Sequence, residues 1–83
     1  MELLAARQRV IDTLLGWGQE AELIGERLLL RDRHYVGRRF EHAGGWAVWL
    51  FDADEIKFYN SDREFLTTVR LVNQEHQTMR RAA

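Results

Sequence analysis

Residues 44–60 read GGWAVWLFDADEIKFYN, two short apolar runs joined by an acidic turn. A strand with one face on a core and the other in water alternates apolar and polar residues. The first run, residues 46–51, instead carries no charged side chain. The stretch therefore predicts a β-hairpin whose second face is only half polar. What that second face does is the main question that the sequence raises.

Turn signals on either side of this stretch predict the register of the neighbouring strands. Turns at residues 32–33, 44–45 and 53–54 separate four predicted strands, which are residues 26–30, 34–42, 46–51 and 56–59. In this register Phe40 faces Trp49, and Phe51 faces Ile56. All three turns give the same apolar face, and a slip of one residue would reverse every side chain. The predicted core face holds Leu29, Val36, Phe40, Ala47, Trp49, Phe51, Ile56 and Phe58.

Helical patterns flank the predicted strands on both sides. Residues 2–15 repeat apolar side chains at spacings of three, four and seven, which indicates an amphipathic helix. Ser61 and Glu64 match a capping box and predict a second helix over residues 62–79. The predicted fold class is α+β: a helix, a four-stranded antiparallel meander and a C-terminal helix, with both helices on one face. Residues 1–83 form one domain.

The second sheet face mixes charged and large apolar side chains, with Glu26 and Glu41 among the charged ones. Contiguous exposed apolar surface of this kind indicates a binding surface. Two alternatives stay open: residues 16–25 cover the face, or Trp46 and Tyr59 lie on the aliphatic stems of Arg39 and Lys57. The predicted partner surface holds Tyr35, Arg39, Trp46, Val48, Leu50, Lys57 and Tyr59.

Residue chemistry gives little support for an enzyme. The chain has no Cys, and its one Ser, Ser61, is explained by the capping box. His34 and His42 lie on one predicted strand about 26 Å apart at ~3.3 Å per residue, too far to share a metal ion. His76 falls in the apolar stripe of the second predicted helix. We expect no catalytic residue, no metal site and no cofactor.

A nucleic-acid-binding module is the alternative function. Arginines interleaved with aromatic residues on a sheet can bind single-stranded nucleic acid through phosphate contacts and stacking. The segment of residues 26–45 has a net charge of only +2, which is a weak basic signal. The candidate residues for this alternative are Arg31, Arg33, Arg38 and Arg39.

The favoured prediction is a small non-enzymatic protein-interaction or regulatory module. Its partner is another protein or a second copy of the chain, in which case it forms a homodimer. The net charge of −1 gives no general attraction to nucleic acid or anionic lipid. No secretory signal and no window of ~20 apolar residues occurs in the sequence. We therefore expect a cytoplasmic protein with no membrane contact.

Overall fold

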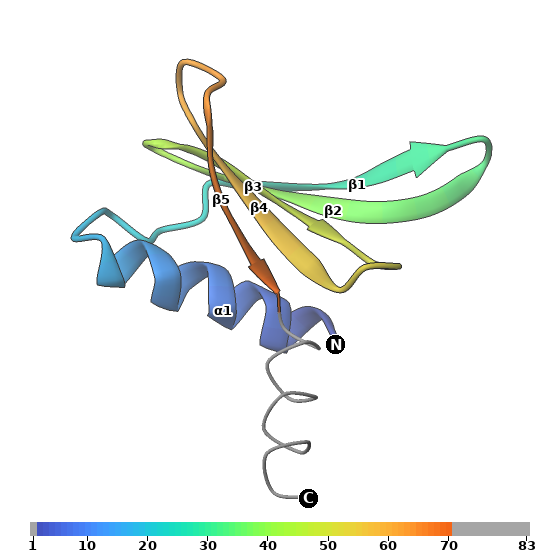
Figure 1. Ribbon diagram of the computed structural model, residues 1–83, viewed down its shortest axis with the longest axis horizontal. Helices are drawn as coiled ribbons and strands as arrows, with labels where there is room; N and C mark the ends of the chain where they lie inside the picture. Colours follow the sequence, from blue (N-terminus) through green and yellow to red (C-terminus); the bar gives the residue numbers. More distant parts are fainter. Residues whose placement is uncertain (1, 71–83) are drawn as a thin grey trace, which may run out of the picture.

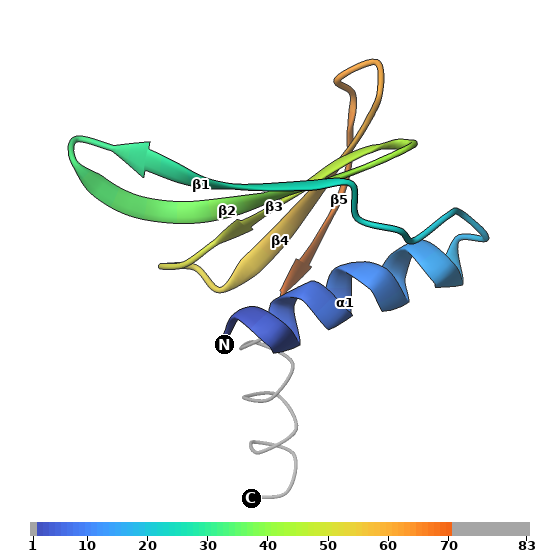
Figure 2. The same ribbon diagram turned by 180° about the vertical axis from the view of Figure 1, so that it is seen from behind.

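The computed structural model describes residues 2–70, which form one helix and one antiparallel sheet. Helix α1 spans Leu3–Gly16. The strands are β1 Gly25–Arg31, β2 His34–His42, β3 Gly45–Leu50, β4 Glu55–Asn60 and β5 Phe65–Arg70. They lie in the order β1-β2-β3-β4-β5, a simple meander. Helix α1 lies along one side of this twisted sheet (Figure 1), and the view from behind shows the same two layers (Figure 2). The α+β class is confirmed.

The side of the sheet that packs on α1 is called the inner face, and the opposite side the outer face. The carboxylate of Glu2 caps α1 by accepting hydrogen bonds from the amides of Leu4 and Ala5. Ala6, Val10 and Leu14 follow at helical spacing and are fully buried against the sheet. The helix predicted over residues 2–15 is therefore confirmed. No helix within residues 2–70 is long and apolar enough to cross a membrane.

The inner face supplies the rest of the core. Most of the predicted core face is confirmed, and Phe51 is partly buried against it. The carboxylate Oδ1 of Asp54 accepts a hydrogen bond from Trp49 Nε1 at 3.0 Å, which satisfies the indole of a buried tryptophan. Asp54 therefore belongs to the core, whereas its sequence context predicts an exposed turn. The buried sheet residues are Phe40, Ala47, Trp49, Ile56 and Phe58.

The predicted pairings between the central strands are wrong by two residues. Phe40 pairs with Ala47, and Trp49 pairs with Ile56. The cause is turn placement: His42 pairs with Gly45, so the turn residues are 43–44, and the turn between β3 and β4 spans residues 51–54. A shift of two residues keeps each side chain on its face, so the face assignment of these strands survives.

Gly45 lies inside β3 instead of in the turn. Its φ is +148°, and a Cβ atom there would clash with the carbonyl oxygen of Tyr59. Glycine is therefore required for close approach of β3 to β4, which is a different reason from the turn conformation that the sequence predicts.

A β-bulge reverses which side chains of β1 lie on the inner face and which lie on the outer face. The predicted turn at Asp32 and Arg33 is confirmed, and both residues have positive φ. The pairing then shifts by one residue between Leu29 and Leu30, so Glu26 pairs with Phe40 instead of Arg39. The prediction that Glu26 lies on the second face is therefore wrong: it lies on the inner face, beside α1. Leu29 pairs with Gly37, which in turn pairs with Leu50 of the outer face, so the prediction that Leu29 lies on the core face opposite Val36 is also wrong.

The sheet has five strands instead of the predicted four, because residues 65–70 form β5 and not a helix. The sequence FLTTVR contains three consecutive β-branched residues, which favour a strand. The expected capping box is replaced by a turn centred on Asn60. Its Oδ1 accepts from the amides of Asp62 and Glu64, and its Nδ2 donates to the Glu64 carboxylate. The remainder of the predicted second helix, residues 71–79, lies outside the described residues.

Candidate functional site on the outer face of the sheet

The outer face is formed by side chains from all five strands. Arg39 pairs with Val48, which pairs with Lys57, so these three form one row across β2, β3 and β4. A second row joins Glu41 to Trp46 and Trp46 to Tyr59. Direct cross-strand partners share a face, so both rows point away from α1. Of the predicted partner surface, the structure brings together Arg39, Trp46, Val48, Leu50, Lys57 and Tyr59, all half-buried.

The segment between α1 and β1 does not cover this face. Ala21 and Leu23 pack against the inner core, and the ring of Trp17 makes an edge contact with inner-face Phe58 at 5.1 Å. The first alternative from the sequence, cover by residues 16–25, is therefore wrong.

Three aromatic side chains, Trp46, Tyr59 and Phe65, form a row across β3, β4 and β5, called the aromatic row. The rings of Trp46 and Tyr59 are stacked with centroids 5.5 Å apart and an interplanar angle of 17°. Tyr59 meets Phe65 edge-on at 5.8 Å. Because Trp46 and Tyr59 are direct cross-strand partners, stacking makes their rings stand up from the sheet with the faces turned toward each other. Phe65 is 55% exposed.

Two cations lie against this row. The guanidinium carbon of Arg39 is 4.3 Å from the ring centroid of Trp46, and the Lys57 ammonium is 5.6 Å from that of Phe65. Both distances fall within the range of cation–π attraction. The second alternative from the sequence placed Trp46 and Tyr59 on aliphatic stems, whereas the structure places the guanidinium of Arg39 over Trp46 and the ammonium of Lys57 over Phe65.

Two groups of paired charges lie on the outer face, one on each side of the row formed by Arg39, Val48 and Lys57. Glu41 is shared by Arg39 at 3.4 Å and Arg27 at 3.6 Å. Glu55 is shared by Arg70 at 3.2 Å and Lys57 at 3.6 Å. Each group therefore has two cations and one carboxylate. Arg27 and Arg70 are the outermost members, and their side chains are 66% and 63% exposed.

Arg39 is incompletely satisfied within the described residues. Its Nε is buried and has no hydrogen-bond partner there. Its hydrogen bond to the described residues runs from Nη2 to the Glu41 carboxylate and is long, at 3.4 Å. A buried donor without a partner costs free energy, so this arginine gains from any further acceptor that reaches it.

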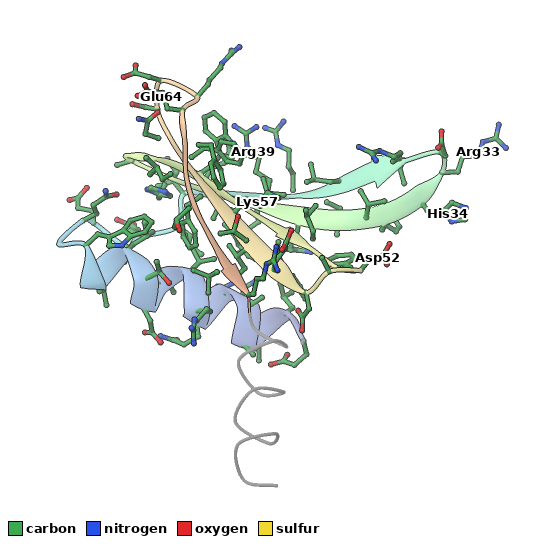
Figure 3. The ribbon with its side chains drawn as sticks, viewed as in Figure 1. Arg33, His34, Arg39, Asp52, Lys57 and Glu64 are labelled. Carbon is green, nitrogen blue, oxygen red and sulfur yellow. The ribbon has the colours of Figure 1, made fainter. Side chains whose placement is uncertain are left out.

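The four arginines of the nucleic-acid alternative do not form one surface. Figure 3 shows Arg39 on the side of the sheet away from α1, whereas Arg33 and His34 lie at the distant tip of the β1–β2 hairpin. Arg31 is in β1, paired with His34 next to that tip. Arg38 is on the inner face, where its Nε donates to Glu26 at 3.0 Å. Tyr35, from the predicted partner surface, is also near the hairpin tip and is 63% exposed.

Sequence reasoning misses several members of the outer face, namely Arg27, Leu29, Glu55, Phe65 and Arg70. The capping signature places Phe65 and Arg70 on a helix, and the predicted register places Arg27 on the core side of β1. The run of β-branched residues in FLTTVR is the signal that would place the first two on a strand. The bulge that moves Arg27 has no comparable signal in the sequence.

The inner face holds a third ionic group, between α1 and the sheet. Glu26 accepts from Arg7 Nε at 2.8 Å and Nη2 at 2.9 Å, and from Arg38 Nε at 3.0 Å. Hydrogen bonding to Arg7 is the largest cause of a lowered pKa at Glu26, and Arg38 lowers this pKa further. The same bond raises the pKa of Arg7. This group joins the first half of α1 to β1 and β2.

A buried histidine, His42, is the last residue of β2. His42 is 6% exposed, and its Nδ1 accepts a hydrogen bond from the Gly44 amide at 3.2 Å. Burial lowers the pKa of His42. The neutral imidazole is therefore the form that the fold stabilises.

The residues that the structure describes contain no group of three or more His, Asp or Glu side chains placed to hold a metal ion. An open depression of about 260 Å³ lies beside the turn after β3. It is lined by Arg31, Val36, Leu50, Asp52 and Ala53. Three of these residues are apolar, one is a cation and one is an exposed acid, and none is a nucleophile. Comparison of the chain with protein-family models, with curated proteins and with solved structures gives no match.

Proposed function

We propose that this chain is a small non-enzymatic interaction module that binds another protein through the outer face of its sheet. The observation that carries the proposal is the aromatic row on the side opposite α1, which ends in the exposed ring of Phe65. Large apolar and aromatic side chains gathered on one surface, with Arg beside them, are typical of protein interfaces.

The chemistry of the described residues supports binding over catalysis. Ser61, the one serine of the chain, lies in the exposed turn after β4. The half-buried carboxylates of Glu26, Glu41 and Glu55 are each engaged by two cations. A general acid or base needs a pKa near the working pH, and the pKa of Glu26 is lowered away from it by hydrogen bonds from Arg7 and Arg38.

Proximity labelling in the native host tests the proposal. Fusions of the wild-type chain are compared with Phe65→Asp, which places a charge in the aromatic row. Leu15→Asp is the matched control, because Leu15 is 60% exposed on α1. We expect Phe65→Asp to lose partners that wild type and Leu15→Asp both retain. If Phe65→Asp retains every partner of the wild type, the outer face is not the interaction surface.

A further inference from the structure

We infer that the partner of the outer face is an acidic polypeptide segment, whose carboxylates contact Arg39 and Lys57 while apolar side chains contact the aromatic row. This inference rests on the proposed function and adds the chemistry of the partner. Three observations carry it: the charge of the face, the incomplete pairing of Arg39 and the orientation of the aromatic rings.

The charge of the outer face is opposite to that of the whole chain. Its two ionic groups hold four cations and two carboxylates, which gives +2, whereas the chain carries −1. Complementary charge at an interface guides encounter and selects the partner. A second copy presenting the same face would bring two surfaces of +2 together, which is unfavourable. The charge therefore favours an acidic partner over face-to-face self-association.

Arg39 is arranged to receive a carboxylate. Its guanidinium is stacked on Trp46, which fixes its plane and leaves its N–H edge as the binding edge. Within the described chain, Glu41 engages it only through the 3.4 Å contact from Nη2. Guanidinium and carboxylate form two parallel hydrogen bonds when geometry permits. A partner carboxylate would supply this guanidinium with acceptors that Glu41 does not.

The aromatic rings are poorly placed to bind nucleobases. Stacking of a base requires a free ring face. One face of Trp46 is turned to Tyr59 and the ring also carries Arg39, whereas Tyr59 meets Phe65 edge-on. The ring edges that remain suit packing against aliphatic side chains of a polypeptide. An acidic protein segment fits these rings better than single-stranded RNA or DNA does.

A random peptide library displayed on phage and selected on the immobilised full chain tests the inference. We expect the selected peptides to be enriched in Asp and Glu next to at least one large apolar residue. Synthetic copies are then titrated by fluorescence anisotropy. Arg39→Gln should weaken binding by about tenfold, as loss of one charge-assisted contact predicts. Arg33→Gln removes the same charge at the distant hairpin tip and should change the affinity by less than about twofold.

Other results overturn the inference in distinguishable ways. Selection of uncharged apolar peptides that bind wild type and Arg39→Gln equally, but not Phe65→Asp, removes the acidic partner and keeps the proposed function. Tighter binding of labelled oligo(dT) than of the selected peptides replaces the partner with a nucleic acid. A dimer in sedimentation experiments that Leu50→Lys dissociates replaces it with a second copy. Failure to enrich any peptide over a protein-free selection removes both the inference and the proposed function.

Discussion

The two faces of the sheet use the same chemistry with different geometry. On the inner face, Glu26 binds Arg7 and Arg38 at 2.8 and 3.0 Å beneath α1. On the outer face, Glu41 and Glu55 contact their cations at 3.2–3.6 Å. The inner group has shorter contacts and more hydrogen bonds than the two outer groups, although the side chain of Glu55 on the outer face is itself only 13% exposed. The difference indicates that packing by α1 fixes the inner group as a structural tie, while the outer groups keep hydrogen-bonding capacity for a ligand.

Two tryptophans three residues apart on β3 provide the largest test of this comparison. Trp49 is 7% exposed, contacts Phe51 and donates to Asp54. Trp49→Ala should lower the free energy of unfolding by about 3–5 kcal/mol, and it removes the hydrogen bond from Trp49 Nε1 to Asp54. Trp46→Ala should lower it by only ~1–2 kcal/mol, the value of one stacked pair and one cation–π contact. Urea denaturation followed by circular dichroism measures both.

Equal destabilisation by the two alanine variants would contradict the comparison. It would mean that the outer face is as much a part of the core as the inner face. The argument for a binding surface would then lose its physical basis.

The two sets of carboxylates give a second, smaller contrast. Glu26→Gln should cost about 1 kcal/mol, because two arginines lose a charged acceptor at a partly covered site. Glu41→Gln should cost less than about 0.5 kcal/mol, as is usual for solvent-exposed pairs with long contacts. Chemical denaturation near neutral pH measures both, and a larger effect at Glu41 would reverse the assignment of structural and open groups.

Acid should weaken the inner group specifically. The pKa of Glu26 is lowered in the folded state, so its contribution to stability is complete above the usual glutamate pKa of about 4.3 and is lost as the pH falls through the lower folded value. Glu26→Gln should therefore flatten the decline of stability in this range. An unchanged decline in the variant would show that Glu26 is not the group responsible.

His42 adds a pH effect at the inner face in a milder range. Its folded pKa is lowered by burial, so the unfolded chain binds its proton more tightly. Stability is then complete above about pH 6.5 and declines as the pH falls below that value toward the folded pKa. His42→Asn keeps an acceptor for the Gly44 amide without titrating. Thermal melts between pH 5 and 8 should show a flatter profile for this variant than for wild type.

A small effect is also expected at Leu50, which is half-buried on the outer face and paired with Glu55. Leu50→Lys should change the free energy of unfolding by less than about 1 kcal/mol, because the new ammonium reaches water and lies next to a carboxylate. Differential scanning calorimetry measures the shift. Unfolding as severe as that of Trp49→Ala would place Leu50 in an internal environment.

Periodicity predicts the faces of the central strands but not their pairing. It assigns Trp46, Val48 and Leu50 correctly to one face and Ala47 and Trp49 to the other, because period-two alternation survives a shift of two residues. The pairs themselves depend on turn geometry, and the turn predicted at residues 44–45 is displaced by one residue. The glycine pattern cannot distinguish a turn from a close strand contact, since both need the absence of Cβ.

The remaining failures come from tertiary context. A bulge in β1 places Glu26 on the inner face, and the ion pairs of Glu26 with Arg7 and Arg38 depend on this placement. No pattern in the sequence indicates the bulge. The capping signature at Ser61 and Glu64 predicts a helix, but Asn60 closes a hairpin there by binding the amide and carboxylate of Glu64. The predicted capping box does not form, because the Glu64 amide is bound by Asn60 instead of Ser61, and the element after the turn is a strand.

The aromatic row also gives the molecule a built-in optical reporter. The three tryptophans lie in three different environments: Trp17 beside Phe58, Trp49 in the core, and Trp46 on the outer face under the Arg39 guanidinium. Emission from a buried indole lies at shorter wavelength than emission from one in contact with water or charge. In a chain carrying Trp17→Phe and Trp49→Phe, fluorescence comes from Trp46 alone. Occupancy of the outer face can then be followed by the emission wavelength and intensity of Trp46, without any attached label.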